Sequence, residues 1–189
     1  MTSILTRRRL LKGSLAGLVA GVSSGCADHR SGQRVVVVGA GHVGAAVTEV
    51  AARAGFRVVV LDDRADFANP IRLPDATQIL VGDPRVRLGA LDAHPDRHIV
   101  LVTRGHRLDA ECLEVALDLR ALYVGMIGSR RRVRRIREWL AERGVEGARL
   151  EKLHAPIGLD IGAETPGEIA VAIVAEIIAA RSELRRKGG

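Results

Sequence analysis

The sequence has 189 residues, of which 47% are hydrophobic, 27% are charged and only 2% are aromatic, and its formal net charge is +7. A chain of this length and apolar content can bury one core, which favours a single folded domain. The scarcity of aromatic side chains argues against a nucleic-acid binder, because such proteins stack bases on aromatic rings.

Residues 1–33 are predicted to be a targeting leader, and they carry +4 of the net +7, so the rest of the chain is only mildly basic. TRRRLLK, from Thr6, resembles a twin-arginine export signal with Leu10 where phenylalanine is commonest. The apolar stretch that follows is too short to span a bilayer as a helix. SSGC, ending at Cys26, resembles a lipoprotein cleavage box. We therefore expect export to the periplasm or attachment to the membrane as a lipoprotein. A cytoplasmic protein with a basic leader is the alternative.

Residues 34–189 are predicted to form one domain in which strands and helices alternate. Runs of β-branched residues predict strands, and apolar residues at helical spacing predict helices. The strand candidates are RVVVVG, FRVVVLDD, TQILVGD, HIVLVTR and LYVGMIG, and the helix candidates span 42–55, about 106–121, 129–143 and 165–185. Thr165 and Glu168 form a capping box around Pro166 at the start of the last helix. This pattern predicts an α/β fold, a doubly wound and mainly parallel sheet in a Rossmann-like three-layer domain.

The first strand-to-helix turn has the glycine pattern of a dinucleotide-binding loop, Gly39-Ala40-Gly41-His42-Val43-Gly44. Gly39 permits a tight turn, Gly41 lets the backbone approach a pyrophosphate, and Gly44 allows close packing of helix on strand. The helix N-terminus adds positive potential. We expect Gly39, Gly41, His42 and Gly44 to bind a cofactor.

Asp62 ends the second predicted strand 18 residues after Gly44. An acid at this place accepts hydrogen bonds from ribose hydroxyls in dinucleotide-binding folds. Asp62 and Asp63 together would repel a 2′-phosphate, which favours NAD over NADP.

Further candidates lie where other strands end, because ligands of this fold bind outside the carboxyl ends of its strands. The segment HAPIGLDIGAETP adds polar residues in a predicted irregular loop. The catalytic residue, if there is one, is not fixed by the sequence, and the candidates are His106, Asp109 and His154. Asp109 either orients His106 or only interacts favourably with the helix dipole. The cofactor-binding candidates outside the glycine turn are Asp62, Thr103, His106, Gly128, Ser129, Arg130 and Asp160.

The segment MIGSRRRVRRIREW concentrates arginines on one predicted helix. Val133, Ile136 and Leu140 form its apolar stripe, which leaves Arg131, Arg134 and Arg135 in solvent. The first helical turn differs, because cations there oppose the helix dipole and an anion would offset that cost. For Arg130 an anion-binding role and a merely solvated position are both open.

The cysteines exclude two classes of site. Cys26 and Cys112 are the only two, so the sequence offers no disulfide framework and no CxxC metal site, and we expect no bound metal at such a motif. Cys112 stands in an apolar helical pattern, which predicts a buried structural thiol.

Five segments together resemble one family. They are VVVVGAGHVGAAV, LDDRADFANPIRLPDA, VTRGHRLDAECLEVAL, YVGMIGSRRRV and LHAPIGLDIGAETPGEIAVAIVAEII. From about Arg34 to Arg181 the chain is similar to the Rossmann domain of the XdhC/CoxF family, maturation factors for xanthine and carbon monoxide dehydrogenases. The resemblance implies an accessory protein rather than a catalyst. Such a protein binds molybdenum cofactor, protects it while the terminal sulfur is added, and delivers it to a molybdenum hydroxylase such as xanthine, aldehyde or carbon monoxide dehydrogenase.

The resemblance also sets the expected cofactor and partners. Molybdopterin often occurs in bacteria as a cytosine dinucleotide, whose pyrophosphate the glycine turn could hold as readily as that of NAD. A sulfur-donating desulfurase and a second copy of the chain are further candidate partners. Full-length family members carry a preceding domain with a cysteine motif. We expect the leader to replace that domain here, and neither cysteine fits its motif.

Two other functions remain open. An NAD-dependent oxidoreductase would need a general acid or base, for which His106 and His154 are the candidates. An NAD-sensing regulatory module would bind the nucleotide without turning over a substrate.

Overall fold

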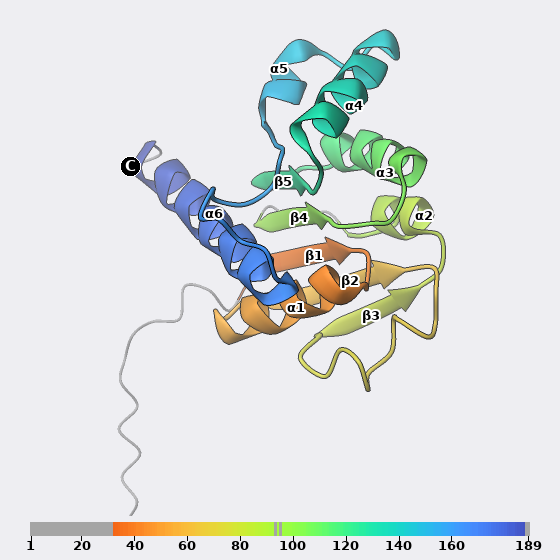
Figure 1. The fold of residues 1–189 in the computed structure, drawn as a ribbon, viewed down its shortest axis with the longest axis vertical. Coiled ribbons are helices and arrows are strands. Elements are labelled where there is room, and N and C mark those ends of the chain that lie inside the picture. The colour runs from red at the N-terminus through yellow and green to blue at the C-terminus, as the bar shows by residue number, and fades with distance from the viewer. Residues whose placement is uncertain (1–31, 93, 95, 188–189) are drawn as a thin grey trace, which may run out of the picture.

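The computed structural model describes residues 32–92, 94 and 96–187, so residues 1–31 of the predicted leader lie outside the described residues. Its last residue, Gln33, is buried and accepts a hydrogen bond from Arg181 at 2.8 Å. Six strands form one sheet in the order β3-β2-β1-β4-β5-β6, and every pairing is parallel (Figure 1). The predicted doubly wound α/β fold is confirmed. The strands are β1 (Arg34–Val38), β2 (Arg57–Asp62), β3 (Gln78–Val81), β4 (Arg97–Leu101), β5 (Tyr123–Met126) and β6 (Leu153–His154).

The central strands are apolar at nearly every position because helices cover both faces of the sheet. Val36 of β1 lies in register with Val59 of β2 on one side and Ile99 of β4 on the other. The chain leaves β1 toward β2 and later returns to its other side as β4. A crevice therefore opens between β1 and β4 at the carboxyl edge, which is where this fold binds ligands.

Two helices cover one face of the sheet and four cover the other (Figure 1). α1 (His42–Arg53) and α6 (Pro166–Lys187) pack on the first face and α2 (Pro84–Gly89), α3 (His106–Asp118), α4 (Arg130–Glu142) and α5 (Gly147–Glu151) on the second. Each face has its own apolar cluster, centred on Val47 and Ile173 in the first and on Leu113 and Leu140 in the second. Among the described residues, no helix is both long enough and apolar enough to cross a membrane.

The long helices and strands lie where the sequence pattern predicts them, but the shortest elements, α2, α5 and β6, were not predicted. The capping box is confirmed, since the Thr165 amide donates to Glu168 at 2.9 Å and the Glu168 amide donates to Thr165 at 3.3 Å. Helices α2 and α5 are not predicted by the pattern, because neither is long enough to show an apolar period. The irregular loop predicted at His154 is wrong for that residue, which lies in the two-residue strand β6 and pairs with β5.

Candidate functional site

The glycine turn packs tightly on one side and is open on the other. Gly39 has a φ of +112°, and a Cβ at Gly44 would lie 1.8 Å from the Gly39 carbonyl oxygen. Only glycine fits at Gly44 without moving backbone. A Cβ at Gly41, by contrast, would meet no atom within 4 Å. No side chain caps α1, and its first turn holds no acidic residue. The start of α1 therefore offers an anion both space and positive potential.

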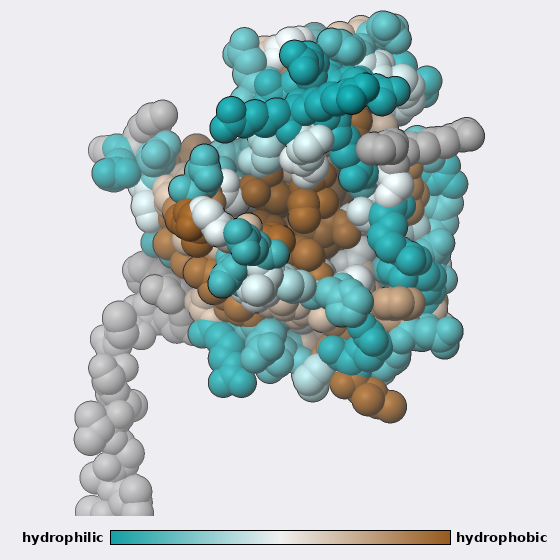
Figure 2. All heavy atoms as spheres, viewed as in Figure 1, coloured by the Kyte–Doolittle hydropathy of each residue, from teal (hydrophilic) through white to brown (hydrophobic). Residues whose placement is uncertain are grey.

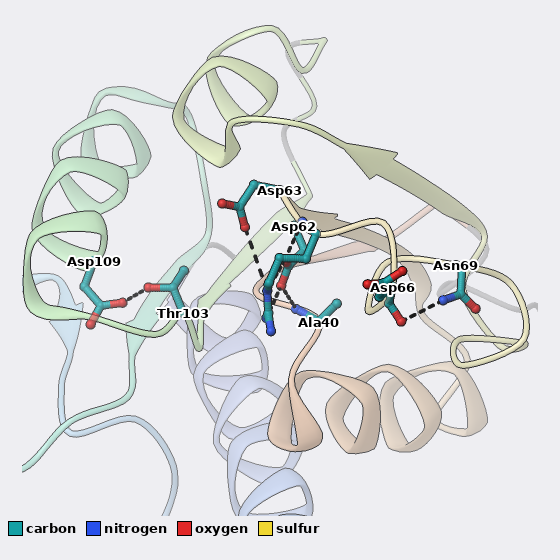
Figure 3. A network of polar contacts seen from close by, with 8 residues as sticks. Ala40, Asp62, Asp63, Asp66, Asn69, Thr103 and Asp109 are labelled. Carbon is teal, nitrogen blue, oxygen red and sulfur yellow. Dashed lines mark hydrogen bonds and ion pairs between the residues drawn. The ribbon is translucent and has the colours of Figure 1, made fainter.

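Asp62 supports the glycine turn from beneath. Its side chain is only 4% exposed, and its Oδ2 accepts from the Ala40 amide at 2.7 Å (Figure 3). Arg64 donates to both carboxylate oxygens, from its Nε at 2.8 Å and its Nη2 at 2.8 Å, and its amide donates to Oδ1 at 3.0 Å. Burial alone would raise the pKa of Asp62, but the hydrogen bonds from Arg64 and Ala40 lower it below the ordinary value.

This arrangement changes the role expected of Asp62. Each carboxylate oxygen already accepts two hydrogen bonds, which fills the acceptor capacity of a carboxylate. A ribose hydroxyl would reach Asp62 only after displacing Arg64. In this structure the acid holds the Ala40 amide and the Arg64 side chain instead.

A cavity of about 230 Å³ lies at the carboxyl edge between these elements. It brings together three of the predicted residues, Gly39, Asp62 and Thr103. The prediction missed two of its cationic side chains, Arg64 and Arg104. Both arginines follow closely after the end of a strand, which is a position typical of ligand-binding residues in this fold. The sequence does not show, however, which side chains at a strand end turn toward the cavity. The remaining lining residues are Asp63, Pro84 and Leu108.

Thr103 connects this cavity to the next helix. Its hydroxyl donates to the buried carboxylate of Asp109 (Figure 3). The same carboxylate forms an ion pair with Arg132 of α4. Asp109 lies in the first turn of α3, as the helix-dipole alternative requires. Its contacts with Thr103 and Arg132, however, were not predicted. His106 begins α3, but its side chain lies outside what the structure describes.

Helix α4 presents its arginines as the spacing predicts. Val133, Ile136 and Leu140 are buried, whereas Arg131, Arg134 and Arg135 are exposed. Figure 2 shows hydrophilic side chains gathered over α4 and α5 at the top of the view. Ser129 caps the helix by accepting from the Arg132 amide at 3.3 Å.

Two depressions flank α4. A groove of about 910 Å³ lies toward α3 and includes Ser129, Arg131 and Arg135 in its lining. A second, of about 400 Å³, is lined by Arg130 and Arg134 and by Pro156 of the following loop. Neither depression is lined by a residue of the glycine turn, so Ser129 and Arg130 do not share the cavity of Gly39.

His154 belongs to a different polar cluster. Its ring stacks on Tyr123 with centroids 4.4 Å apart, and its Nδ1 lies 3.4 Å from Glu176. Tyr123 donates to Glu176 at 2.5 Å and the Gly158 amide donates to it at 2.8 Å, so Glu176 ties the loop after β6 to α6. Burial would raise the pKa of Glu176, but the hydrogen bonds from His154, Tyr123 and Gly158 lower it. His154 lines a cavity of about 550 Å³ that shares no lining residue with the glycine-turn cavity.

Three further predicted residues lie at or near the surface. His42 is exposed at the start of α1, Gly128 is half-buried before α4, and Asp160 is exposed in the loop after β6. Cys112 is fully buried, as predicted, and burial raises the pKa of its thiol to about 12. Within the part of the chain that the structure describes, no three His, Cys, Asp or Glu side chains gather as metal ligands.

Known proteins resemble this chain in sequence. Residues 35–177 match the family described as the XdhC Rossmann domain. The chain is 36% identical over 151 residues to the uncharacterized protein YqeB of Escherichia coli K12, covering 79% of this chain and 28% of YqeB. It is 30% identical over 152 residues to a Bacillus subtilis protein named as a probable xanthine dehydrogenase subunit, covering 80% of this chain and 44% of that protein.

A solved structure agrees with the fold. The crystal structure of a xanthine dehydrogenase from Bacillus halodurans superposes with a TM-score of 0.73 and 30% sequence identity, covering 83% of this chain and 46% of the other. The chain thus spans less than half the length of each of these relatives.

Proposed function

This chain belongs to the XdhC family through its Rossmann domain, and from that premise we propose that it is an accessory protein for a molybdenum hydroxylase of the xanthine dehydrogenase type. Its task would be to bind molybdenum cofactor and deliver it to that enzyme. The relatives named for xanthine dehydrogenase support the partner class.

The observation that carries the proposal is the open side of the glycine turn. The space at Gly41 and the uncapped start of α1 suit a pyrophosphate, which is common to NAD and to the cytosine dinucleotide form of the cofactor. Backbone amides at the start of α1 can bind a pyrophosphate, but they supply no acid, base or nucleophile for a reaction. This suits a protein that holds and releases a cofactor.

The position of His154 favours binding over hydride transfer by that residue. An oxidoreductase needs a general acid or base within hydrogen-bond reach of the reacting atoms. His154 instead stacks on Tyr123 and lines a cavity separate from that of the glycine turn. This supports a cofactor-handling role.

Gly41→Asp tests the proposal, with Gly41→Ala as the matched control. The aspartate would place a carboxylate where the pyrophosphate lies, and the open space at Gly41 accommodates either side chain. Each variant is purified from a host that makes the molybdenum enzyme, and bound molybdenum and nucleotide are measured by elemental analysis and mass spectrometry.

We expect Gly41→Asp to lose the bound cofactor and to lower the activity of the co-expressed hydroxylase, with an unchanged melting temperature. Gly41→Ala, which adds a methyl group and no charge, should lose less of both than Gly41→Asp. Unchanged cofactor retention in Gly41→Asp would contradict the proposal.

A further inference from the structure

Three arginines converge on one aromatic ring beside the glycine-turn cavity. The guanidinium carbons of Arg64, Arg72 and Arg104 lie 3.7, 4.8 and 5.6 Å from the centroid of the Phe67 ring. They come from three separate places: the end of β2, the loop between β2 and β3, and the end of β4. We call this group the arginine cluster.

Only one of these three charges is paired. Arg64 pairs with Asp62 and also lies 3.9 Å from Asp63, yet its Nη1 is buried without a hydrogen-bond partner. Across residues 32–92, 94 and 96–187, Arg72 and Arg104 form no ion pair. Like charges held around one ring repel, and an anion between them would offset that repulsion.

The loop that carries Phe67 and Arg72 is held in place by its own hydrogen bonds. The side chain of Asn69 donates to the carbonyl of Asp66 at 2.9 Å (Figure 3). It also accepts from the Arg72 amide at 3.1 Å. Leu73 is buried against the sheet. These contacts fix the loop that places Phe67 and Arg72 in the arginine cluster.

Two arginines of the cluster, Arg64 and Arg104, lie where this fold receives the ribose of a dinucleotide. With the pyrophosphate at the start of α1, the adjoining ribose lies beyond the carboxyl end of β2. Arg64 and Arg104 line the cavity there, together with Gly39. The charge of Asp62, which should repel a phosphate, is neutralised by Arg64. Asp63 also lines the cavity, but its side chain is 60% exposed and lies 3.9 Å from Arg64, so solvent and that arginine screen its charge.

We propose that the glycine-turn site binds a dinucleotide with a phosphoryl group on this ribose, the feature that separates NADP from NAD. Arg104, which lines the cavity, binds that phosphoryl group, and Arg72 adds positive charge from outside the lining. Arg64 supports the group while keeping Asp62 in place. Planar guanidiniums suit phosphate because they donate two parallel hydrogen bonds. The inference rests on the proposed binding of a dinucleotide at the glycine turn, and it reverses the preference for NAD expected from Asp62 and Asp63.

The test compares NADP⁺ with NAD⁺, and 2′,5′-ADP with 5′-AMP, by calorimetric titration of the full chain at two salt concentrations. We expect NADP⁺ to bind about tenfold more tightly than NAD⁺, since each charge-assisted hydrogen bond contributes strongly, and we expect added salt to reduce the difference. The double variant Arg72→Ala with Arg104→Ala should remove the preference by lowering the affinity for NADP⁺ far more than the affinity for NAD⁺. Arg104→Lys should keep part of it.

Arg53→Ala is the control for net charge, because Arg53 is exposed in the last turn of α1 and away from the cavity. It should keep the preference for NADP⁺. Equal affinity of the wild type for NADP⁺ and NAD⁺ would overturn the inference, as would an equal loss of both ligands in the double variant. If NAD⁺ binds equally and Gly41→Asp abolishes that binding, this inference fails while the glycine-turn function stands. If neither NAD⁺ nor NADP⁺ binds, this inference fails, and the retention of molybdenum cofactor in the wild type and in Gly41→Asp still decides the proposed function.

Discussion

Asp109 in the first turn of α3 forms an ion pair with Arg132 in the first turn of α4. The Asp109 side chain has no exposed surface and Arg132 is 19% exposed, so the pair is largely removed from water. Because Thr103 donates to the same carboxylate, the contact joins the end of β4, the start of α3 and the start of α4. One acidic side chain thus links the end of β4 to the starts of two helices at the carboxyl edge of the sheet.

Asp109→Asn should lower the free energy of unfolding by about 2 to 4 kcal/mol, because it leaves a mostly buried guanidinium without its counter-charge. Asp118→Asn is the matched control. Asp118 also lies on α3 and also pairs with an arginine, Arg149, but its side chain is 68% exposed. That change should cost less than about 1 kcal/mol. Urea unfolding measures both, and equal effects would show that burial of the Asp109 pair does not matter.

The two glycines of the turn should respond differently to the same change. Gly44→Ala places a Cβ against the Gly39 carbonyl and forces the backbone to move, so it should destabilise the fold by more than about 3 kcal/mol. Gly41→Ala meets open space and should cost less than about 1 kcal/mol, the difference between glycine and alanine at a helix N-cap. Thermal unfolding compares the two, and a tolerated Gly44→Ala would contradict the close approach.

The fold was predictable because its signals are local and repeated. Continuous apolar runs such as Val35 to Val38 are typical of strands buried on both faces, and the capping box at Thr165 marks the start of α6 without tertiary information. The shortest elements were missed because their stability depends on packing. The strand β6 exists because Leu153 and His154 pair with β5, which no local pattern shows.

The site was only partly predictable because side-chain direction depends on contacts between distant residues. The glycine turn follows from its spacing, so Gly39, Gly41 and Gly44 were found. A ribose contact was expected at Asp62 because of its position at the end of the second strand. The sequence does not show that the side chain of Arg64 turns toward Asp62 rather than to solvent. The arginine cluster needs Phe67, Arg72 and Arg104 to meet from separate segments, and sequence spacing carries no such information.

His98 makes stability depend on pH. It is fully buried on β4, and burial lowers the pKa of its imidazole from 6.5 to about 4. The unfolded chain therefore binds the proton more readily than the folded one. Stability is complete above about pH 6.5 and falls as the pH drops toward 4. Between pH 7 and pH 5 the free energy of unfolding should fall by about 2 kcal/mol.

The measurement is urea unfolding at intervals of half a pH unit from 7 to 5, a range above that in which Asp62 and Glu176 take up protons. His98→Gln removes the titrating group, so its stability should change far less over the same range. If the wild type and His98→Gln show the same pH slope, the burial of His98 does not control acid sensitivity.

Substituting the arginines at the start of α4 should show whether these side chains affect stability, ligand binding or both. Arg130 and Arg131 are exposed at the positive end of the helix and, within the described residues, form no ion pair. Cations there oppose the helix dipole, so Arg130→Ala with Arg131→Ala should raise the free energy of unfolding by about 0.3 to 1 kcal/mol per residue. The matched control is Arg134→Ala with Arg135→Ala, one turn further along the same exposed surface, where the dipole effect is weaker. An anion-binding role for the first pair adds a second effect, which is weaker retention of cofactor and a smaller dependence of its affinity on salt. A first pair that gains stability with unchanged cofactor affinity would show that these side chains are only the solvated start of the helix.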